Sequence, residues 1–417
     1  MNASVQTHML RHPRPRVVSK NHWELSMPKT VILGTARTPI GKLGGGLASL
    51  DATELGGTAI KCALERANVE PEQVDHVVMG QVLQAGQGQI PSRQAQIKAG
   101  IPKEVSSETI NKVCASSVRA VGLLDSAIRA GDVTVGVGGG MESMSQAPYL
   151  LPQARFGYRM GDAKALDAMV HDGLTNPFSG KQMFVEATEV GDELEITRPD
   201  LDKWALRSHE KALEAIDSGR MSDEIVSVTI KGRKGDTVVE VDEGPRRGSS
   251  LESLSKLPGL VGKEGSHTAG NSPGVNDGAG ALVLASDEWA EQNGREVLAT
   301  ILGQAQMAND FPYLATTPAA AAKKLLDKLG MSADEIDLWE INEAFASVTL
   351  HSMRMLGIDE EKVNVNGGAV ALGHPIGASG ARIIGSLVHE LRRRGGGLGM
   401  AAICSGGGQG DAVLIKV

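Results

Sequence analysis

Aromatic residues are scarce in this chain of 417 residues, because Phe, Trp and Tyr together make up only 3%. An interior with so few rings has to be built from aliphatic side chains. Glycine is abundant instead, with 52 residues, and this indicates many tight turns or close backbone approaches. The combination favours an α/β fold with Gly-rich loops between strands and helices. The length exceeds that of one ordinary core, so we expect two or three domains.

Cysteine is also rare, with only Cys62, Cys114 and Cys404. This odd, sparse count does not suggest a secreted disulfide framework and favours a reducing compartment, which we take to be cytoplasmic. No Cys-x-x-Cys pair is present, and we expect no metal site. No stretch approaches the length of a membrane span, so we expect no membrane association. The net charge of −8 argues against nucleic acid as a partner.

The N-terminal segment differs in composition from the rest of the chain. It is basic up to Glu24 and lacks the apolar core of a secretion signal. We interpret residues 1–26 as a basic, disordered tail, or as the product of an early start with Met27 as the true one. A transit-like segment is the minority alternative.

The first part of the chain alternates strand-like and helix-like segments. Residues 30–41 predict a buried strand with a turn, and residues 51–69 predict an amphipathic helix with Asp51 as its N-cap. Residues 74–83 predict a central strand. Residues 108–145 then predict a strand, a turn with Cys114, a helix capped by Gly131, and a strand ending at glycines 138–140.

The last part of the chain repeats this plan. Residues 362–417 predict a strand, a Gly-rich turn with His374, a helix and a strand that ends at Cys404. Residues 74–83 are echoed by residues 336–345, so we predict two duplicated α/β halves with a polar, charge-rich region inserted between them. The predicted divisions are an N-terminal half at 27–144, completed by about 275–294, a covering loop domain at 145–274, and a C-terminal half at 295–417.

Candidate chemistry collects where we predict strands to end. Cys114, His374 and the Asn342-Glu343 pair occupy such places, and open α/β sheets build their sites at the carboxyl ends of strands. A cysteine just before a helix feels the positive end of the helix dipole, which favours the thiolate. A histidine within reach would take the thiol proton. The small residues around His374 would leave room for a substrate.

Each of these signals has an ordinary structural explanation. A lone cysteine is usually buried packing, and a lone histidine is more often structural than catalytic. The segment GHPIGASG lacks the Lys-Ser/Thr of a phosphate loop and fits a dinucleotide fingerprint poorly, which disfavours a nicotinamide-dependent dehydrogenase. The joint occurrence of the signals at matching places in two halves is what favours a catalytic function.

Several separated motifs resemble the thiolase family, in particular its acetyl-CoA acetyltransferase-like members. They are TARTPIGKLGG, NKVCASSVRA, GSHTAGNSPGVNDGAGALVLAS, NEAFA, GHPIGASGAR and CSGGGQGDA, and the resemblance runs from about Met27 to Val417. It implies a thiolase fold: two duplicated α/β halves, each with a five-stranded sheet, in a five-layered α-β-α-β-α arrangement with an inserted loop domain. It also implies a homodimer or homotetramer.

The resemblance assigns catalytic roles to five residues. It makes Cys114 the nucleophile that carries the acyl group, and His374 its activating base. It makes Cys404 the group that removes or returns the α-proton of the second acyl-CoA. Asn342 would hold a water that completes one oxyanion hole, and the N–H groups of Cys114 and Gly406 would form the other. No metal or redox cofactor is implied, and coenzyme A thioesters are the substrates.

The resemblance also places coenzyme A over this site. Arg246 and Ser253 match positions that contact its adenine and pantetheine ends, although a solvated basic turn is the alternative explanation for this segment. Ser272, Leu314 and Phe345 are the further candidate contacts.

Three substitutions depart from the family pattern in this pocket. Gln182 stands where many members carry a histidine, Phe184 replaces a glycine, and Pro273 replaces a serine that contacts the pantetheine arm.

The sequence therefore predicts condensation of two acetyl-CoA to acetoacetyl-CoA and free CoA, or thiolysis of a 3-ketoacyl-CoA. A thiolase for longer chains in fatty-acid metabolism is the first alternative. A ketosynthase-like enzyme is disfavoured, since Asn342 stands in place of a second histidine and Cys404 is present. A non-catalytic acyl-CoA-binding relative is the remaining alternative.

Overall fold

The computed structural model describes residues 28–417, so the predicted tail at 1–26 lies outside the described residues. Ten strands form one mixed sheet in the order β12-β13-β14-β11-β1-β10-β5-β3-β4, with β2 beside β10. The strands are β1 (Thr30–Arg37), β2 (Gly41–Lys42), β3 (His76–Gly80), β4 (Ser106–Ile110), β5 (Val135–Ser143), β10 (Asn276–Ser286), β11 (Ala299–Ala308), β12 (Leu338–Ile341), β13 (Leu398–Ser405) and β14 (Gln409–Lys416).

The sheet consists of two halves with the same internal order. In each half a strand pairs in parallel with the strand that follows the central helix, β3 with β5 and β12 with β13. The next partner is antiparallel in both, β10 and β14. Only two residue pairs, Val31–Thr300 and Ile32–Ala299, join β1 to β11 and so connect the halves. The repeated order agrees with the duplication that the sequence predicts.

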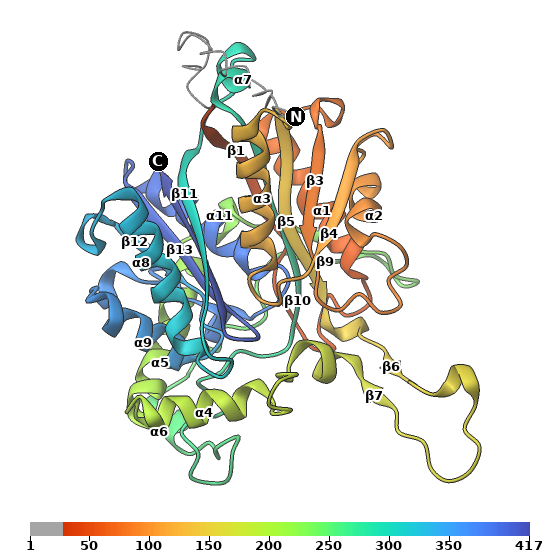
Figure 1. The fold of residues 1–417 in the computed structure, drawn as a ribbon, viewed down its shortest axis with the longest axis vertical. Coiled ribbons are helices and arrows are strands. Elements are labelled where there is room, and N and C mark those ends of the chain that lie inside the picture. The colour runs from red at the N-terminus through yellow and green to blue at the C-terminus, as the bar shows by residue number, and fades with distance from the viewer. Residues whose placement is uncertain (1–27) are drawn as a thin grey trace, which may run out of the picture.

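Helices cover both faces of each half and make five layers (Figure 1). Helices α3 and α11 contact each other and strands of both halves, so they form the central layer. Helices α1 and α2 cover the N-terminal half from outside, and α8 and α9 cover the C-terminal half. Their bounds are α1 (Ala52–Ala67), α2 (Pro91–Lys98), α3 (Ser116–Ala130), α8 (Thr317–Leu329), α9 (Ala346–Leu356) and α11 (Ser379–Arg393), with short helices α7 (Asp287–Gln292) and α10 (Ala369–Leu372).

The alternation of side chains along a buried strand builds these layers. On β10, Leu282 and Leu284 belong to the inner core with α3 and α11, whereas Val283 belongs to the outer core with α1. Helix α1 begins as expected, because Asp51 and Glu54 form a capping box. Helix α3 ends at Gly131, whose φ of 81° is the left-handed cap that the sequence predicts.

Two strand predictions are wrong in detail. Residues 362–366 do not form a strand: Val363 makes a single bridge to Trp339, and Asn364 has a φ of 48°. The Asn364 amide takes the place of a neighbouring strand, because it accepts from Ile341 N and donates to Ile341 O. The strand predicted to end at glycines 138–140 continues to Ser143. Its glycines pack closely against other backbone, and a Cβ on Gly140 would lie 1.9 Å from Gly377 O.

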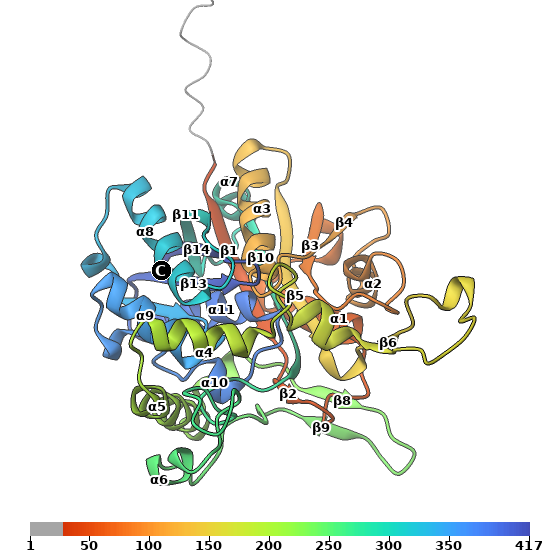
Figure 2. The same cartoon turned by 60° about the horizontal axis from the view of Figure 1, so that its bottom comes forward.

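The region predicted to cover the site contains short strands and three helices. These are β6 (Tyr149–Leu150), β7 (Leu166–Asp167), α4 (Met183–Glu193), α5 (Arg198–Asp217), β8 (Val228–Ile230), β9 (Thr237–Val239) and α6 (Leu251–Ser255). Its helices gather at one end of the molecule, and the β6–β7 hairpin extends away from the body (Figures 1 and 2). Within residues 28–417, no helix combines the length and apolar composition that crossing a bilayer would require.

Candidate active site

A largely apolar cavity of about 210 Å³ lies between the two halves and the covering region. Cys114, His374 and Cys404 all line it, although they come from distant parts of the chain. Other predicted positions line it too: Ser272, Leu314 and Phe345, and the three departures Gln182, Phe184 and Pro273. The structure therefore brings most of the predicted residues together at one place, although Asn342 and Gly406 are not among the residues that line the cavity.

Cys114 lies in a strained turn between β4 and α3. Val113, directly before it, has a φ of 45°, which is unfavourable for a β-branched residue. Hydrogen bonds hold this turn, since Asn111 Oδ1 accepts from Val113 N at 2.9 Å and Ser116 Oγ donates to Val113 O at 2.6 Å. Nothing in the local sequence pattern predicted the strain at Val113.

The surroundings of the Cys114 sulfur favour its neutral thiol form. Burial raises the pKa of the Cys114 thiol to about 12, although N–H groups of Gly406 and of Cys114 itself lower it. Burial thus acts against the thiolate that we expected at the start of a helix, and it outweighs the backbone donors. These two N–H groups are the pair predicted to form an oxyanion hole, and both favour negative charge on the sulfur.

His374 lies between α10 and α11, not at the end of a strand as predicted. Its Nδ1 is 2.6 Å from Ser379 Oγ, and Ser379 Oγ donates its single proton to Pro375 O at 3.0 Å. Ser379 Oγ must therefore accept a hydrogen bond from Nδ1–H, which assigns the tautomer with an unprotonated Nε2. Nε2 is buried and has no partner within residues 28–417. This ring nitrogen can act as a proton acceptor.

The surroundings of His374 favour its neutral form. Burial lowers the pKa of His374 to about 3, and the nearby Arg382 guanidinium acts in the same direction. Cys404, at the end of β13, is likewise neutral, because burial and the neighbouring Cys114 raise its pKa well above the usual value. The cavity thus holds two thiols and one neutral imidazole, and proton transfer between them has to accompany the reaction.

Asn342 follows β12 directly and is completely buried. Its backbone N–H donates to Ala402 O at 3.0 Å, which fixes it beside β13. Neither Oδ1 nor Nδ2 of its side chain has a hydrogen-bond partner within residues 28–417. A buried amide whose oxygen and nitrogen both lack partners is suited to bind a polar atom of a ligand.

Arg246 and Ser253 do not line the cavity. Both are exposed residues of the covering region. Arg246 N donates to His209 Nδ1 at 3.2 Å, and Ser253 belongs to the capping box of α6. Their contact with coenzyme A stays a prediction.

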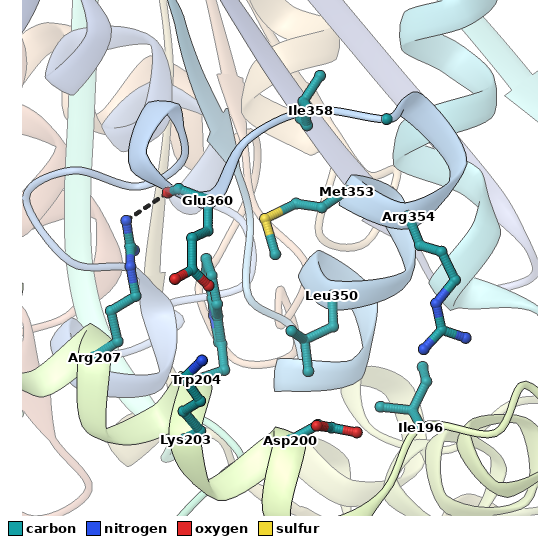
Figure 3. Close-up of a pocket in the computed structure, with 11 residues that line it drawn as sticks. Ile196, Asp200, Lys203, Trp204, Arg207, Leu350, Met353, Arg354, Ile358 and Glu360 are labelled. Atoms are coloured by element: carbon teal, nitrogen blue, oxygen red, sulfur yellow. Dashed lines mark hydrogen bonds between the residues drawn. The ribbon is translucent and has the colours of Figure 1, made fainter.

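A second cavity, of about 530 Å³, opens between α5 and α9 (Figure 3). Trp204, Arg207, Met353 and Arg354 contribute to its wall, and Arg207 donates to Glu360 O across its rim. It contains none of the predicted site residues, so it does not compete with the first cavity as the place of the chemistry.

Sequence reasoning missed the residues that hold the His374 turn. Ser379 fixes the imidazole, Asn276 Oδ1 accepts from His374 N at 2.9 Å, and Glu142 Oε2 accepts from Gly377 N at 2.9 Å. Burial raises the pKa of the Glu142 carboxyl to about 7. Ser379 lies inside the GHPIGASG motif and Asn276 inside the GSHTAGNSPGVNDGAGALVLAS motif, but we predicted no role for either, and Glu142 lies outside the quoted motifs.

Comparisons with known proteins agree with this geometry. Residues 30–288 match the model of the thiolase N-terminal domain, and residues 295–417 match that of the thiolase C-terminal domain. The acetyl-CoA acetyltransferase of Cupriavidus necator is 48% identical over 391 residues, which is 94% of this chain and 100% of that protein. The acetyl-CoA acetyltransferase of Syntrophomonas wolfei is 46% identical over 93% of this chain and 99% of its own length.

Solved structures give the same result. The structure of the Syntrophomonas wolfei acetyl-CoA acetyltransferase aligns with a TM-score of 0.91 and 42% identity, covering 94% of this chain and 99% of that one. The Bacillus anthracis acetyl-CoA acetyltransferase aligns with a TM-score of 0.92 and 41% identity, with the same coverage. This chain belongs to the thiolase family.

Proposed function

We propose that this chain is an acetyl-CoA acetyltransferase, which condenses two acetyl-CoA to acetoacetyl-CoA and free CoA and also catalyses the reverse thiolysis. The observation that carries the proposal is that Cys114, His374 and Cys404 line one cavity. The printed names of the relatives support the acetyl group as the acyl unit.

In the first half-reaction, His374 Nε2 takes the proton of Cys114 as its sulfur attacks the thioester carbonyl of acetyl-CoA. The tautomer fixed by Ser379 leaves Nε2 free for this task. The negative charge that develops on the carbonyl oxygen needs donors fixed in advance. The departing CoA sulfur takes the proton of Cys404, which leaves an acetylated Cys114 and a Cys404 thiolate.

In the second half-reaction, the Cys404 thiolate removes an α-proton from a second acetyl-CoA. The resulting enolate attacks the acetyl carbonyl on Cys114, and Cys114 leaves as a thiolate that recovers its proton from His374. We assign stabilisation of the enolate oxygen to His374 and to a water held by Asn342, and stabilisation of the other oxyanion to N–H of Cys114 and Gly406. The raised pKa of both thiols fits this sequence of steps, because neither thiol has to be ionised before the first acetyl-CoA binds.

We further propose that coenzyme A thioesters are substrates and that no metal or redox cofactor takes part, since acyl and proton transfers complete the reaction. Arg246 and Ser253 are proposed contacts of coenzyme A outside the cavity. We also propose a cytoplasmic homodimer or homotetramer and a role in fatty-acid metabolism.

The test is a thiolysis assay with 3-ketoacyl-CoA substrates of increasing chain length. We expect the highest kcat/KM with acetoacetyl-CoA, because the cavity is small and closed by Leu314 and Phe345 among other apolar side chains. A preference for long chains would favour the β-oxidation alternative. Absence of thiolysis at every length, by folded protein, would contradict the proposed function.

A further inference from the structure

Glu343 is a completely buried carboxylate next to Asn342. Its Oε1 accepts from Trp204 Nε1 at 3.0 Å and from Asn364 Nδ2 at 2.9 Å. Its Oε2 accepts from Ser208 Oγ at 2.8 Å and from Val370 N at 2.9 Å. A buried carboxylate usually has a cationic partner, yet the ion pairs within residues 28–417 include none with Glu343. Four hydrogen bonds stabilise its charge instead.

Two of these donors come from helix α5 of the covering region. The Arg207 guanidinium lies 4.8 Å from the Trp204 ring centroid and donates to Glu360 O and Val363 O, which fixes the indole in place (Figure 3). Ser208 Oγ also accepts from Gly368 N at 3.0 Å. Helix α5 is therefore fastened to the segment that precedes α10.

Of the other two donors, Asn364 lies in that segment and Val370 lies in α10 itself. Asn364 has a left-handed backbone, and a Cβ on Gly368 would lie 2.1 Å from Cδ of Glu343, so the chain passes directly over the carboxylate. Val370 belongs to α10, which ends at Leu372, two residues before His374. The path from the carboxylate to the catalytic imidazole is short and consists of a strained turn and one helical turn.

Building on the proposed function, we propose that Glu343 is a positioning residue that fixes Asn342 and His374 relative to each other. Asn342 is its direct neighbour in the chain, and His374 follows the segment that Glu343 holds. The two side chains are the ones assigned to one oxyanion hole. A misplacement of about 1 Å in such a site costs on the order of 10²-fold in rate.

Glutamine cannot replace Glu343 in this network without a clash between donors. An amide nitrogen at the Oε2 position would face Val370 N–H, and one at the Oε1 position would face Trp204 Nε1–H. Either orientation of the glutamine amide would displace residues 364–370 or helix α5, although the shape and volume of the side chain are almost unchanged. Glu343→Gln is therefore a sharp test, and Ser208→Ala, which removes one donor, is a milder one.

The experiment is a double-mutant cycle on the full-length protein, with thiolysis of acetoacetyl-CoA as the assay. Glu343→Gln is expected to lower kcat by about 10- to 100-fold with little change in KM, since the cavity that binds substrate keeps its lining. If Glu343 acts through Asn342, adding Glu343→Gln to Asn342→Ala should lower kcat by far less than it does alone. Ser208→Ala should show the same non-additivity with a smaller effect.

A matched control separates positioning from stability. Glu224 is a buried carboxylate that does not line the cavity and is paired with Arg37, so Glu224→Gln should lower Tm while kcat of the folded enzyme stays unchanged. The proposal is overturned if Glu343→Gln lowers Tm alone, or if its effect on kcat multiplies fully with that of Asn342→Ala. An inactive wild-type enzyme would instead contradict the proposed function, so the two failures are distinguishable.

Discussion

The turn that carries Cys114 and the turn that carries His374 occupy equivalent places in the two halves. The first precedes α3 and the second precedes α11, and these two helices form the central layer. In the proposed mechanism, one half thus provides the nucleophile and the other half provides the base. The fold repeats, but the chemistry is divided between the copies.

The residues that hold the two turns in place, here called their anchors, come from different halves of the protein. The Cys114 turn is held by the C-terminal half: Lys112 Nζ lies 2.5 Å from Asp411 Oδ1 and donates to Gln306 Oε1 at 2.8 Å, and Ser405 Oγ donates to Lys112 O. These contacts tie the nucleophile to β11, β13 and β14.

The His374 turn is held by the N-terminal half. Asn276 and Glu142 accept from His374 N and Gly377 N, and Ser117 Oγ accepts from Ala381 N at 3.0 Å. Each reactive turn therefore depends on the opposite half for its position. This reciprocal anchoring explains why the site forms at the boundary of the halves, and why neither half alone would hold a working arrangement.

The largest expected effect comes from removing the nucleophile. Cys114→Ala should abolish acyl-enzyme formation, and Cys404→Ala should still form the acyl-enzyme but fail to condense, because the α-proton then has no acceptor. Mass spectrometry after incubation with acetyl-CoA measures the first step, and a condensation assay measures the second. Cys62→Ala, a partly buried cysteine outside the cavity, is the control. An acetyl adduct retained in Cys114→Ala would reverse the division of roles between the halves.

A prediction of intermediate size concerns the protonation state of the Cys114 thiol. Since burial raises the pKa of Cys114 to about 12, the thiolate fraction should grow about tenfold per pH unit below that value. Alkylation by iodoacetamide, measured with Cys62→Ala and Cys404→Ala in place, should therefore accelerate by about 100-fold between pH 7 and pH 9. A rate that is flat over this range would mean that His374 already holds a thiolate in the free enzyme.

The sequence predicted which reactive residues meet at the site, but not the burial of Cys114 or the contacts that hold the two turns. The duplicated strand and helix patterns and the separated motifs were enough to predict that Cys114, His374 and Cys404 share one site, and all three line one cavity. The burial that raises the pKa of Cys114 could not be predicted, because a helix start is visible in the sequence whereas burial depends on the assembled layers. The anchors Asn276, Glu142 and Asp411 were not predicted. Asn276 and Asp411 lie within quoted motifs, but their partners across the boundary between the halves become visible only in the assembled fold.

The smallest expected effect tests how the His374 turn orients its base. Ser379→Ala removes the acceptor that holds Nδ1–H, so both tautomers of His374 become accessible and only one presents an unprotonated Nε2 to the cavity. General-base catalysis contributes about 10²–10⁴-fold, and partial loss of the correct tautomer should lower the rate of Cys114 acylation by about 10-fold. Ser386→Ala, on the same helix but bonded to Glu224, is the matched control and should leave the rate unchanged. Burst kinetics with acetyl-CoA measure acylation directly. An unchanged burst rate in Ser379→Ala would show that the opposite half, through Asn276 and Glu142, positions the imidazole without help from its own turn.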